Sequence, residues 1–311
     1  MIKYRTWSRR GRNIYILRRI HTLAVILFIF FIIIATVLIV SRVKSGVSNE
    51  KRDILRVWNA GDFEQTFLLS KNALLQKPVD NFLLSINGFS AYQLGISQIN
   101  NQNMLFFINE CIFSLRKALI HKESADDARL YYVLGKAYGY KGKEYSDLVI
   151  KNLLMANNLG YEAQDIPEYL GLAYAASGDY RNSVAAFSQA FHPEKIPSDS
   201  LLLSIARSYI AMEEYDMALN YLMRCIEISP DSKSIIIARM LLAQVFSLTR
   251  NFNSAEEQYF IILTESGENA EVRFQLGELY NMMGDITRAR AEWRLAFRLD
   301  PAHSRARARL N

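Results

Sequence analysis

The chain has 311 residues, enough for about two ordinary domains, and half of them are hydrophobic, so a sizeable buried core is expected. Six prolines and 14 glycines are too few for a collagen-like or β-turn-rich protein, and two cysteines cannot form a disulfide framework or a four-thiolate zinc site. The net charge of +6 comes from the N-terminal tail, because residues 1–49 hold nine basic and no acidic residues, whereas residues 50–311 hold 28 basic and 31 acidic residues. This distribution argues against nucleic-acid binding by the folded body.

An apolar run from Leu23 to Val40, interrupted only by Thr36, predicts a membrane span. As a helix its 18 residues rise about 27 Å, close to the roughly 30 Å hydrocarbon core of a bilayer. The alternatives are a buried core helix and a cleaved signal peptide. The run is longer than the apolar stretch of a signal peptide, and Arg42 and Lys44 stand where a cleavage site needs small neutral residues. We therefore expect a basic tail at residues 1–22 and an uncleaved transmembrane helix at residues 23–41, with Leu23–Val40 contacting lipid.

Basic residues flank the predicted span unequally, with seven before it and four in the first 15 or so residues after it. Because positive charge is retained on the cytoplasmic side, this asymmetry predicts a cytoplasmic N-terminus. Residues 41–311 would then lie across the membrane. In a bacterium the chain would be a single-pass inner-membrane protein with a periplasmic C-terminal domain.

From about residue 47 the chain reads as successive amphipathic helices, with apolar residues spaced three and four apart. A short pattern recurs along it: Leu276-Gly277 and Tyr280 in one copy align with Ile205-Ala206 and Tyr209 in another. One position of this pattern favours a small residue and recurs every 34–47 residues. Its seven occurrences are Ile54, Gly88, Gly135, Gly171, Ala206, Ala243 and Gly277.

Close helix crossings explain the small residues of the pattern. Gly277 and Ala289 allow the two helices of one copy to approach, Ala296 allows the second helix to meet the next copy, and Pro301 ends that helix. Turns between the paired helices are expected at Gly61-Asp62, Gly178-Asp179 and Gly284-Asp285. The second copy is longer than the others, and its Gln- and Asn-rich stretch Ile96–Met104 predicts a loop between two helices.

This pattern resembles the tetratricopeptide repeat, a helix–turn–helix unit of 34 residues. The resemblance covers about residues 47–303, with specific matches in the last four copies and looser ones in the first three. It implies an all-α, right-handed α-solenoid of about seven repeats over residues 47–301, in which stacked neighbours form a continuous core. We expect residues 302–311 to add a capping helix, with Ala302, Ala306 and Leu310 on its apolar face. The alternative for this arginine-rich end is a basic docking patch.

No motif for catalysis, cofactor binding or metal binding is found in the sequence. The four histidines have no histidine or cysteine at the spacing of a metal site, and no phosphate-binding loop or nucleophile elbow occurs. Cys111 and Cys225 lie about three repeats apart, too far to bond to each other, and Cys225 occupies a small-residue packing position. We therefore expect neither an enzyme nor a cofactor.

The resemblance implies that the first helix of each repeat lines a concave groove that binds partners. Carried over to this sequence, the candidate groove residues are Phe89, Tyr92, Arg129, Tyr132, Lys136, Tyr140, Arg207, Gln244, Glu278 and Asn281, with Asp165, Glu168, Leu203 and Phe274 among further positions. The group around Arg129 and Tyr132 is the strongest candidate, because tyrosine and arginine are enriched at interface hot spots. The alternative is that these tyrosines pack between helices. The lysine and asparagine pattern of chaperone-tail clamps is absent, so that activity is not carried over.

The resulting hypothesis is a membrane-anchored scaffold that binds other proteins and supports an envelope machine, such as secretion, outer-membrane or cell-wall assembly, or a flagellar or pilus structure. One alternative is a receptor or chaperone that binds polypeptide segments in the groove, with the solenoid facing the cytosol. Another is a regulatory subunit of an enzyme. The sequence leaves self-association open.

Overall fold

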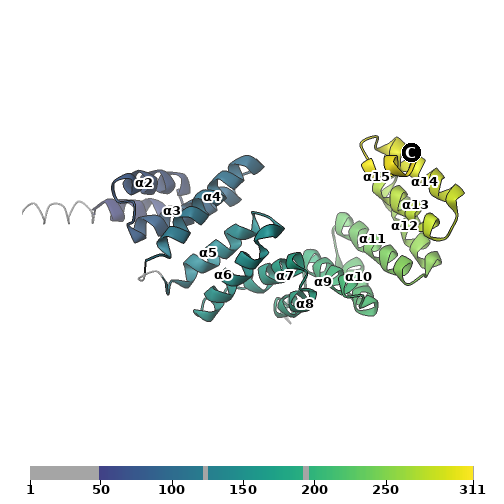
Figure 1. The fold of residues 1–311 in the computed structure, drawn as a ribbon, viewed down its shortest axis with the longest axis horizontal. Helices are drawn as coiled ribbons and strands as arrows, with labels where there is room; N and C mark the ends of the chain where they lie inside the picture. The colour runs from purple at the N-terminus through teal and green to yellow at the C-terminus, as the bar shows by residue number, and fades with distance from the viewer. Residues whose placement is uncertain (1–48, 122–124, 192–195, 311) are drawn as a thin grey trace, which may run out of the picture.

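The computed structural model describes residues 49–121, 125–191 and 196–310. Residues 49–59 are helical, and the elements that follow run in chain order along a curved row (Figure 1). These are α2 (Phe63–Gln76), α3 (Asn81–Ile96), α4 (Asn101–Ala118), α5 (Ala128–Gly139), the 3₁₀ turn η2 (Lys143–Tyr145), α6 (Ser146–Asn158), α7 (Ile166–Ser177), α8 (Tyr180–Gln189), α9 (Asp199–Ala211), α10 (Tyr215–Ile228), α11 (Ser232–Leu248), α12 (Phe252–Ser266), α13 (Ala270–Met282), α14 (Ile286–Leu299) and α15 (Ser304–Leu310).

The helices form antiparallel pairs that stack side by side, beginning with residues 49–59 and α2 and ending with α13 and α14. The described ranges contain no strand, so the expectation of an all-α helical solenoid is confirmed. Two of the pairs, α2–α4 with the preceding helix, occupy one end of the molecule, and α11–α15 occupy the other (Figure 1). None of the helices in these ranges has the length and apolarity needed to cross a bilayer. The predicted span at residues 23–41 lies outside the described residues.

The small-residue position marks the closest approach between paired helices. A Cβ atom added to Gly277 would lie 2.5 Å from the indole of Trp293, and one added to Gly171 would lie 2.5 Å from the ring of Phe187. Gly135 stands in the same relation to Leu153 at 2.8 Å. Real Cβ atoms do not approach side chains this closely, so the predicted need for small residues in these repeats is confirmed.

The turns between paired helices use a left-handed residue. Gly178 and Gly284 have φ angles of 83° and 82°, and the aspartate after each glycine caps the next helix by accepting a hydrogen bond from its backbone. Glu213 and Arg250 occupy the equivalent place in two other repeats with φ angles of 61° and 60°. Non-glycine residues strain the backbone in this region, so the repeat geometry, rather than residue preference, decides the turn there.

The expected loop at Ile96–Met104 is wrong. Helix α3 continues through Ile96, and α4 starts at Asn101, so the loop spans only residues 97–100. The Asn100 side chain accepts hydrogen bonds from the backbone N–H groups of Gln102 and Asn103, which makes the polar stretch a helix start. The greater length of this repeat comes partly from α4, which has 18 residues.

A buried polar network joins α2, α3 and α4. Asn87 donates hydrogen bonds to the Phe67 carbonyl at 3.3 Å and to Ser70 Oγ at 2.9 Å, and it accepts one from Ser114 Oγ at 2.9 Å. The side chains of Asn87, Ser70 and Ser114 are almost wholly buried, and their hydrogen bonds to one another replace the hydrogen bonds to water that burial removes. The sequence pattern does not predict this network.

Helix α15 packs on the last repeat through Ala306, which is fully buried. Arg305 forms an ion pair with Glu271 at 2.5 Å, and Arg309 forms one with Glu278 at 2.5 Å. These arginines also cover the rings of Phe274 and Trp293. Two of the three arginines of α15 are therefore used in holding the helix to α13 and α14.

Candidate partner-binding groove

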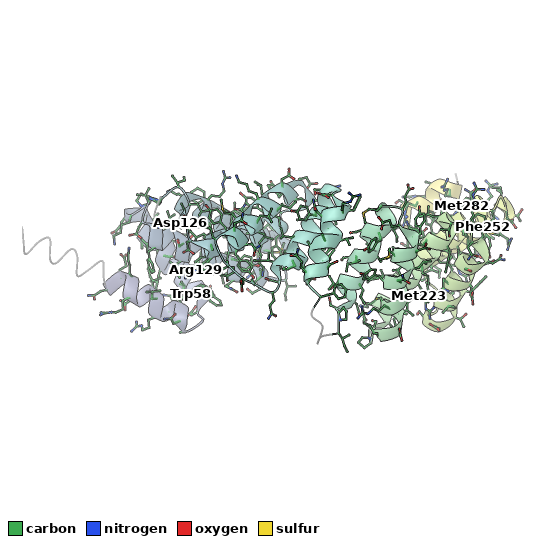
Figure 2. The ribbon with its side chains drawn as sticks, turned by 90° about the horizontal axis from the view of Figure 1, so that it is seen from below. Trp58, Asp126, Arg129, Met223, Phe252 and Met282 are labelled. Carbon is green, nitrogen blue, oxygen red and sulfur yellow. The ribbon has the colours of Figure 1, made fainter. Side chains whose placement is uncertain are left out.

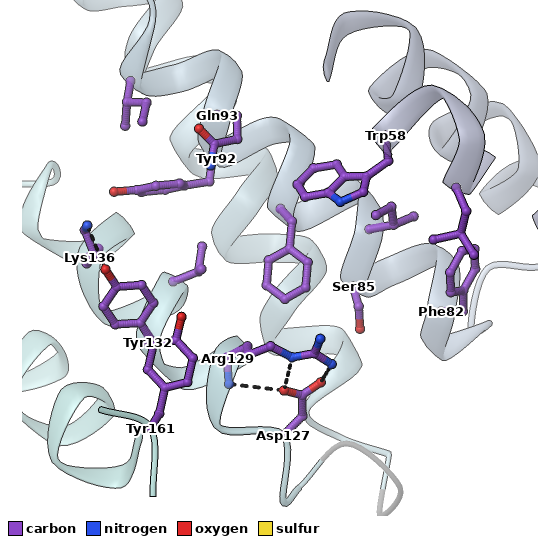
Figure 3. Close-up of a pocket in the computed structure, with 15 residues that line it drawn as sticks. Trp58, Phe82, Ser85, Tyr92, Gln93, Asp127, Arg129, Tyr132, Lys136 and Tyr161 are labelled. Atoms are coloured by element: carbon purple, nitrogen blue, oxygen red, sulfur yellow. Dashed lines mark hydrogen bonds and ion pairs between the residues drawn. The ribbon is translucent and has the colours of Figure 1, made fainter. Parts of the chain in front are cut away.

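A cavity of about 520 Å³ opens in the first repeats, between residues 49–59, α3 and α5. Its size falls in the range typical of binding pockets. Figure 3 shows side chains from these three helices turned toward a common space. We call this cavity the N-terminal groove, and it is lined by Leu55, Trp58, Phe82, Ser85, Ile86, Phe89, Tyr92, Gln93, Ile96, Asp127, Arg129, Tyr132, Val133, Lys136 and Tyr161.

Six of the fifteen residues that line the groove are aromatic. Trp58 stands 5.1 Å from Phe63 and 6.5 Å from Phe89, measured between ring centroids, so the rings hold one another in place. On the opposite wall Tyr132 packs against Tyr161 at 4.7 Å. Such rings offer a large contact area with little conformational freedom to lose on binding.

One edge of the groove carries an ion pair between neighbours. Arg129 donates from Nε to Asp127 Oδ1 at 3.0 Å and from Nη2 to Asp127 Oδ2 at 2.8 Å (Figure 3). Asp127 also caps α5 by accepting from the Arg129 backbone at 3.1 Å. These hydrogen bonds lower the pKa of Asp127 and raise the pKa of Arg129, so both groups stay charged and neutralise each other.

Lys136 lies on α5 at the back of the groove, in a cage of tyrosines. Its Nζ atom is 4.7, 5.0 and 5.9 Å from the ring centroids of Tyr169, Tyr132 and Tyr92. The ammonium donates to Asp165 at 2.7 Å, and the Tyr132 hydroxyl donates to the same carboxylate at 2.9 Å. Asp165 comes from the next repeat, directly before α7, so this group ties two repeats together.

Burial alone lowers the pKa of an ammonium, but the hydrogen bonds to Asp165 and Tyr132 raise the pKa of Lys136 above the ordinary lysine value. Burial also raises the pKa of Tyr92 and Tyr132, so both hydroxyls stay neutral. Each base of the N-terminal groove thus has an acidic partner within hydrogen-bonding distance. The groove offers an incoming chain apolar and aromatic contacts rather than free positive charge.

The structure brings five of the predicted groove residues together. Phe89, Tyr92, Arg129, Tyr132 and Lys136 line one cavity although they come from two repeats. Tyr92 is almost wholly buried, and Lys136 is held by the surrounding tyrosines and Asp165. These two side chains therefore support the groove wall and offer little surface to a partner. Trp58 and Tyr161 were missed, and the signal for Trp58 was its position in the first helix of the first repeat, four residues after Ile54.

The remaining predicted residues lie along the other repeats. Tyr140 packs against Tyr92 and lines a neighbouring hollow with Tyr169. Gln244 and Glu278 line a smaller hollow of about 300 Å³ between α11 and α13. Arg207 is exposed on α9, and Asn281 is half-exposed at the end of α13. Figure 2 shows that these positions are spread along the solenoid, with Trp58 and Arg129 near one end and Met282 near the other.

Two further groove expectations are wrong. Leu203 and Phe274 are 5% and 4% exposed, so neither is available to a partner. Leu203 packs with the core of its repeat, and Phe274 lies beneath His303 and Arg305 of the capping segment. Within the part of the chain that the structure describes, no group of three potential metal ligands gathers. Cys111 and Cys225 are both buried and free.

Comparison with known families and structures supports the repeat assignment. Residues 200–232, which include α9 and α10, match the family model of the tetratricopeptide repeat. The described chain is a tetratricopeptide-like solenoid. A search of curated proteins finds no significant match.

Solved structures share this solenoid at low sequence identity. The C-terminal part of a repeat-containing protein from Cytophaga hutchinsonii is 14% identical, with a TM-score of 0.57 over 84% of this chain and 99% of the other. PilW, a widely conserved type IV pilus biogenesis factor, is 15% identical, with a TM-score of 0.56 over 72% of this chain and 98% of PilW. A tetratricopeptide repeat protein from Parabacteroides merdae is 16% identical, with a TM-score of 0.52 over 85% and 96% of the two chains. These likenesses establish the fold.

Proposed function

We propose that this chain is a non-catalytic scaffold that holds a partner protein at a membrane. Leu23–Val40 is the anchor, and the solenoid lies on the extracytoplasmic side, where it supports the assembly of an envelope machine. The partner contributes an apolar, uncharged segment that binds in the N-terminal groove. Membrane lipid and proteins are the expected contacts, and neither cofactor nor nucleic acid takes part.

The composition of the groove is the observation that carries this proposal. Its walls are aromatic, and its bases are already paired, Lys136 with Asp165 and Arg129 with Asp127. An acidic tail would have to displace those partners, whereas an apolar side chain only displaces water from rings that are already in place. The affinity should therefore change little with salt concentration, because the interaction does not depend on screened charges.

Site-specific photo-crosslinking in the native cells tests the groove. A photoreactive residue replaces Phe89 in the groove, and a matched variant replaces Phe260 on α12, in the other half of the solenoid and 46% exposed. We expect one discrete adduct from position 89 and none from position 260. PilW shares the fold and is a pilus biogenesis factor, so pilus components are among the candidates to be sought in the adduct.

Other outcomes contradict the proposal in different ways. Many heterogeneous adducts from position 89 would favour a receptor or chaperone for polypeptide segments. An adduct from position 260 alone would move the interface out of the groove. For a purified partner, Phe89→Ser should weaken binding by at least roughly 30-fold if Phe89 is a hot spot, whereas Phe260→Ser should leave it unchanged.

Topology is tested with Asn251→Cys and a membrane-impermeant maleimide. Asn251 is exposed directly before α12, and its side chain makes no capping hydrogen bond. Burial raises the pKa of the Cys111 thiol and raises that of Cys225 to about 11, so the native cysteines should react slowly. Labelling with an intact inner membrane is expected, and labelling only after lysis would place the solenoid in the cytosol.

A further inference from the structure

The second helices of the first two repeats present large apolar side chains to solvent. Leu68 and Leu75 stand seven residues apart on α2, and Phe106 and Phe113 stand seven apart on α4, with Ile120 following at the same spacing. Seven residues are about two helical turns, so the pairs on α2 and α4 each form one line along their helix, and Ile120 lies in the turn that follows the end of α4 at Ala118. Leu75 and Ile120 are 81% exposed and Phe113 is 64% exposed. We call these five residues the outer apolar face.

The two lines belong to one surface because α2 and α4 are in direct contact. Phe67 packs edge-on against Phe107 with ring centroids 5.5 Å apart, and Lys71 pairs with Glu110 at 3.1 Å. The Lys71 ammonium also lies 5.6 Å from the centre of the Phe106 ring, which places it between the two lines. Two neighbouring lines of large exposed apolar side chains are unusual on a water-soluble face and mark a contact site.

Second helices of the later repeats expose their apolar side chains less, with none in the described residues above the 60% of Met223 on α10. The exposed side of α8 carries Arg181, Asn182 and Ser188, and that of α14 carries Arg290, Arg294 and Arg298. All of these helices have the same place in their repeats, so repeat packing does not require the outer apolar face. The most exposed of these apolar side chains lie in the repeats that immediately follow the N-terminal segment.

We propose that the outer apolar face lies against the bilayer surface, with its side chains among the lipid headgroups and the first acyl carbons. This inference rests on the membrane anchor of the proposed function. Only residues 41–48 separate the end of the apolar run from the first described helical residue, and eight residues reach at most roughly 30 Å. The first two repeats are therefore always held within reach of the membrane.

The charges around the face agree with a lipid surface. The same two helices carry three basic residues near the face, Lys71, Arg116 and Lys117, and two acidic residues, Glu64 and Glu110. The Lys117 ammonium lies 5.8 Å from the centre of the Phe113 ring. Aromatic and aliphatic side chains with adjacent bases are the composition of surfaces that rest in the interface of a bilayer.

This contact would also orient the scaffold. The N-terminal groove is lined by residues 49–59, α3 and α5, whereas the outer apolar face belongs to α2 and α4, the second helices of the same repeats. With the second helices on the lipid, the groove is turned away from the membrane and stays open to a partner.

Lipid-quenched fluorescence of the full-length chain in vesicles tests the contact. Phe113→Cys is labelled with an environment-sensitive nitrobenzoxadiazole dye, and Phe260→Cys on α12 is the matched control; both positions carry an exposed phenylalanine. The vesicles contain phosphatidylcholine and phosphatidylglycerol, with or without bromine on the acyl chains. We expect brominated lipid to reduce emission at least two-fold from position 113 and not from position 260. Leu75→Cys, on the other helix of the face, should behave like position 113.

Each other result overturns a distinct statement. Equal emission from position 113 in brominated and ordinary lipid, in a chain that floats with the vesicles, contradicts the lipid contact but not the anchor. A blue-shifted emission without bromine quenching shows that a protein or a second copy of this chain covers the face instead. A chain that does not float with the vesicles contradicts the anchor and this proposal with it, while the crosslink from position 89 still tests the groove.

Discussion

The two halves of the solenoid use the same helix packing but present different surfaces. In residues 49–191 the first helices leave an aromatic groove open, and the second helices α2 and α4 expose apolar side chains. In residues 196–310 the equivalent groove position Phe274 is buried under the capping segment, Glu278 is paired with Arg309, and α14 exposes a row of arginines. The residues that set the crossings between helices are alike in both halves. The surfaces that could bind a partner lie at positions that repeat packing leaves free.

The largest effect is expected where a close helix crossing is blocked. Gly277→Ala places a Cβ 2.5 Å from the Trp293 indole and 3.1 Å from the Ala289 carbonyl oxygen, neither of which can move away freely. Gly88→Ala places a Cβ equally close to its neighbour, 2.6 Å from Leu115 Cγ, but that neighbour is an aliphatic side chain smaller than an indole, and the nearest backbone atom, the Cys111 carbonyl oxygen, is 3.4 Å away. After the helix propensity gained from alanine, we expect a loss of about 3 kcal/mol at Gly277 and about 1 kcal/mol at Gly88.

Thermal unfolding followed by circular dichroism measures the two losses, and hydrogen exchange locates them. Because repeats contact only their neighbours, faster exchange should be confined to α13 and α14 for Gly277→Ala. Equal losses at both glycines would show that Trp293 repacks as readily as Leu115.

The next effect concerns the polar core of the N-terminal half. Asn87→Ala leaves Ser70 and Ser114 without their buried partner and should cost about 2 kcal/mol. The control is Asn152→Ala, since Asn152 is also buried but donates only to the Leu148 carbonyl of its own helix. Chemical denaturation of both variants should show a clearly smaller loss for Asn152→Ala. Equal losses would mean that the network adds nothing beyond burial of an asparagine.

Acid should weaken the contact between the capping helix α15 and α13. Burial by itself raises the pKa of Glu271, but hydrogen bonds from Gln275, Arg305 and His303 outweigh it and leave that pKa below the ordinary value. A depressed pKa stabilises the fold above pH 4.5 or so, and the contribution is lost as pH falls through the lower native value. Because Glu271 is partly exposed, Glu271→Gln should cost only about 0.5–1 kcal/mol near neutral pH, and progressively less as the pH falls below 4.5 or so.

Lys136 provides the opposite case, because its pKa is raised. The contribution of Lys136 is complete below pH 10.5 or so and is lost only as pH rises further. Melting temperatures of wild type and Glu271→Gln between pH 2 and pH 9, and of wild type and Lys136→Met between pH 5 and pH 11.5 or so, check both statements. A difference between Lys136→Met and wild type that disappears in mild acid, above pH 5, would contradict this assignment.

The smallest effect is a gain in stability. Arg250 holds a φ angle of 60° in the turn before α12, at the place where Gly284 serves the next repeat. Arg250→Gly should relieve backbone strain and raise the unfolding free energy by about 0.5–1 kcal/mol. The reverse change, Gly284→Ala, should lower it by about 1 kcal/mol. Differential scanning calorimetry of the two variants should show shifts of opposite sign, and shifts of the same sign would contradict the equivalence of the two turns.

Much of the fold could be predicted because the residues that set the packing of each helix pair lie close together in the sequence. Gly171, Gly277 and Trp293 follow from the spacing of small and bulky residues, and each contact lies within one helix pair. The start of α4 could not be placed, because its Gln- and Asn-rich sequence has the composition of a loop and only the capping by Asn100 shows otherwise. Half of the candidate groove residues share one cavity, whereas Leu203 and Phe274 were misplaced because burial depends on what the neighbouring segment covers.

The sequence alone determined the class of the molecule: an apolar run with the length of a membrane span, followed by helix pairs with small residues at their crossings. Only the tertiary structure decided which surfaces are open. It brought Trp58, Phe89 and Tyr161 from separate repeats into one groove, and it paired Lys136 with Asp165 across a repeat boundary. The physical reason is that helix crossings are set by contacts close in sequence, whereas grooves and faces arise from side chains of different repeats that meet only when the repeats stack.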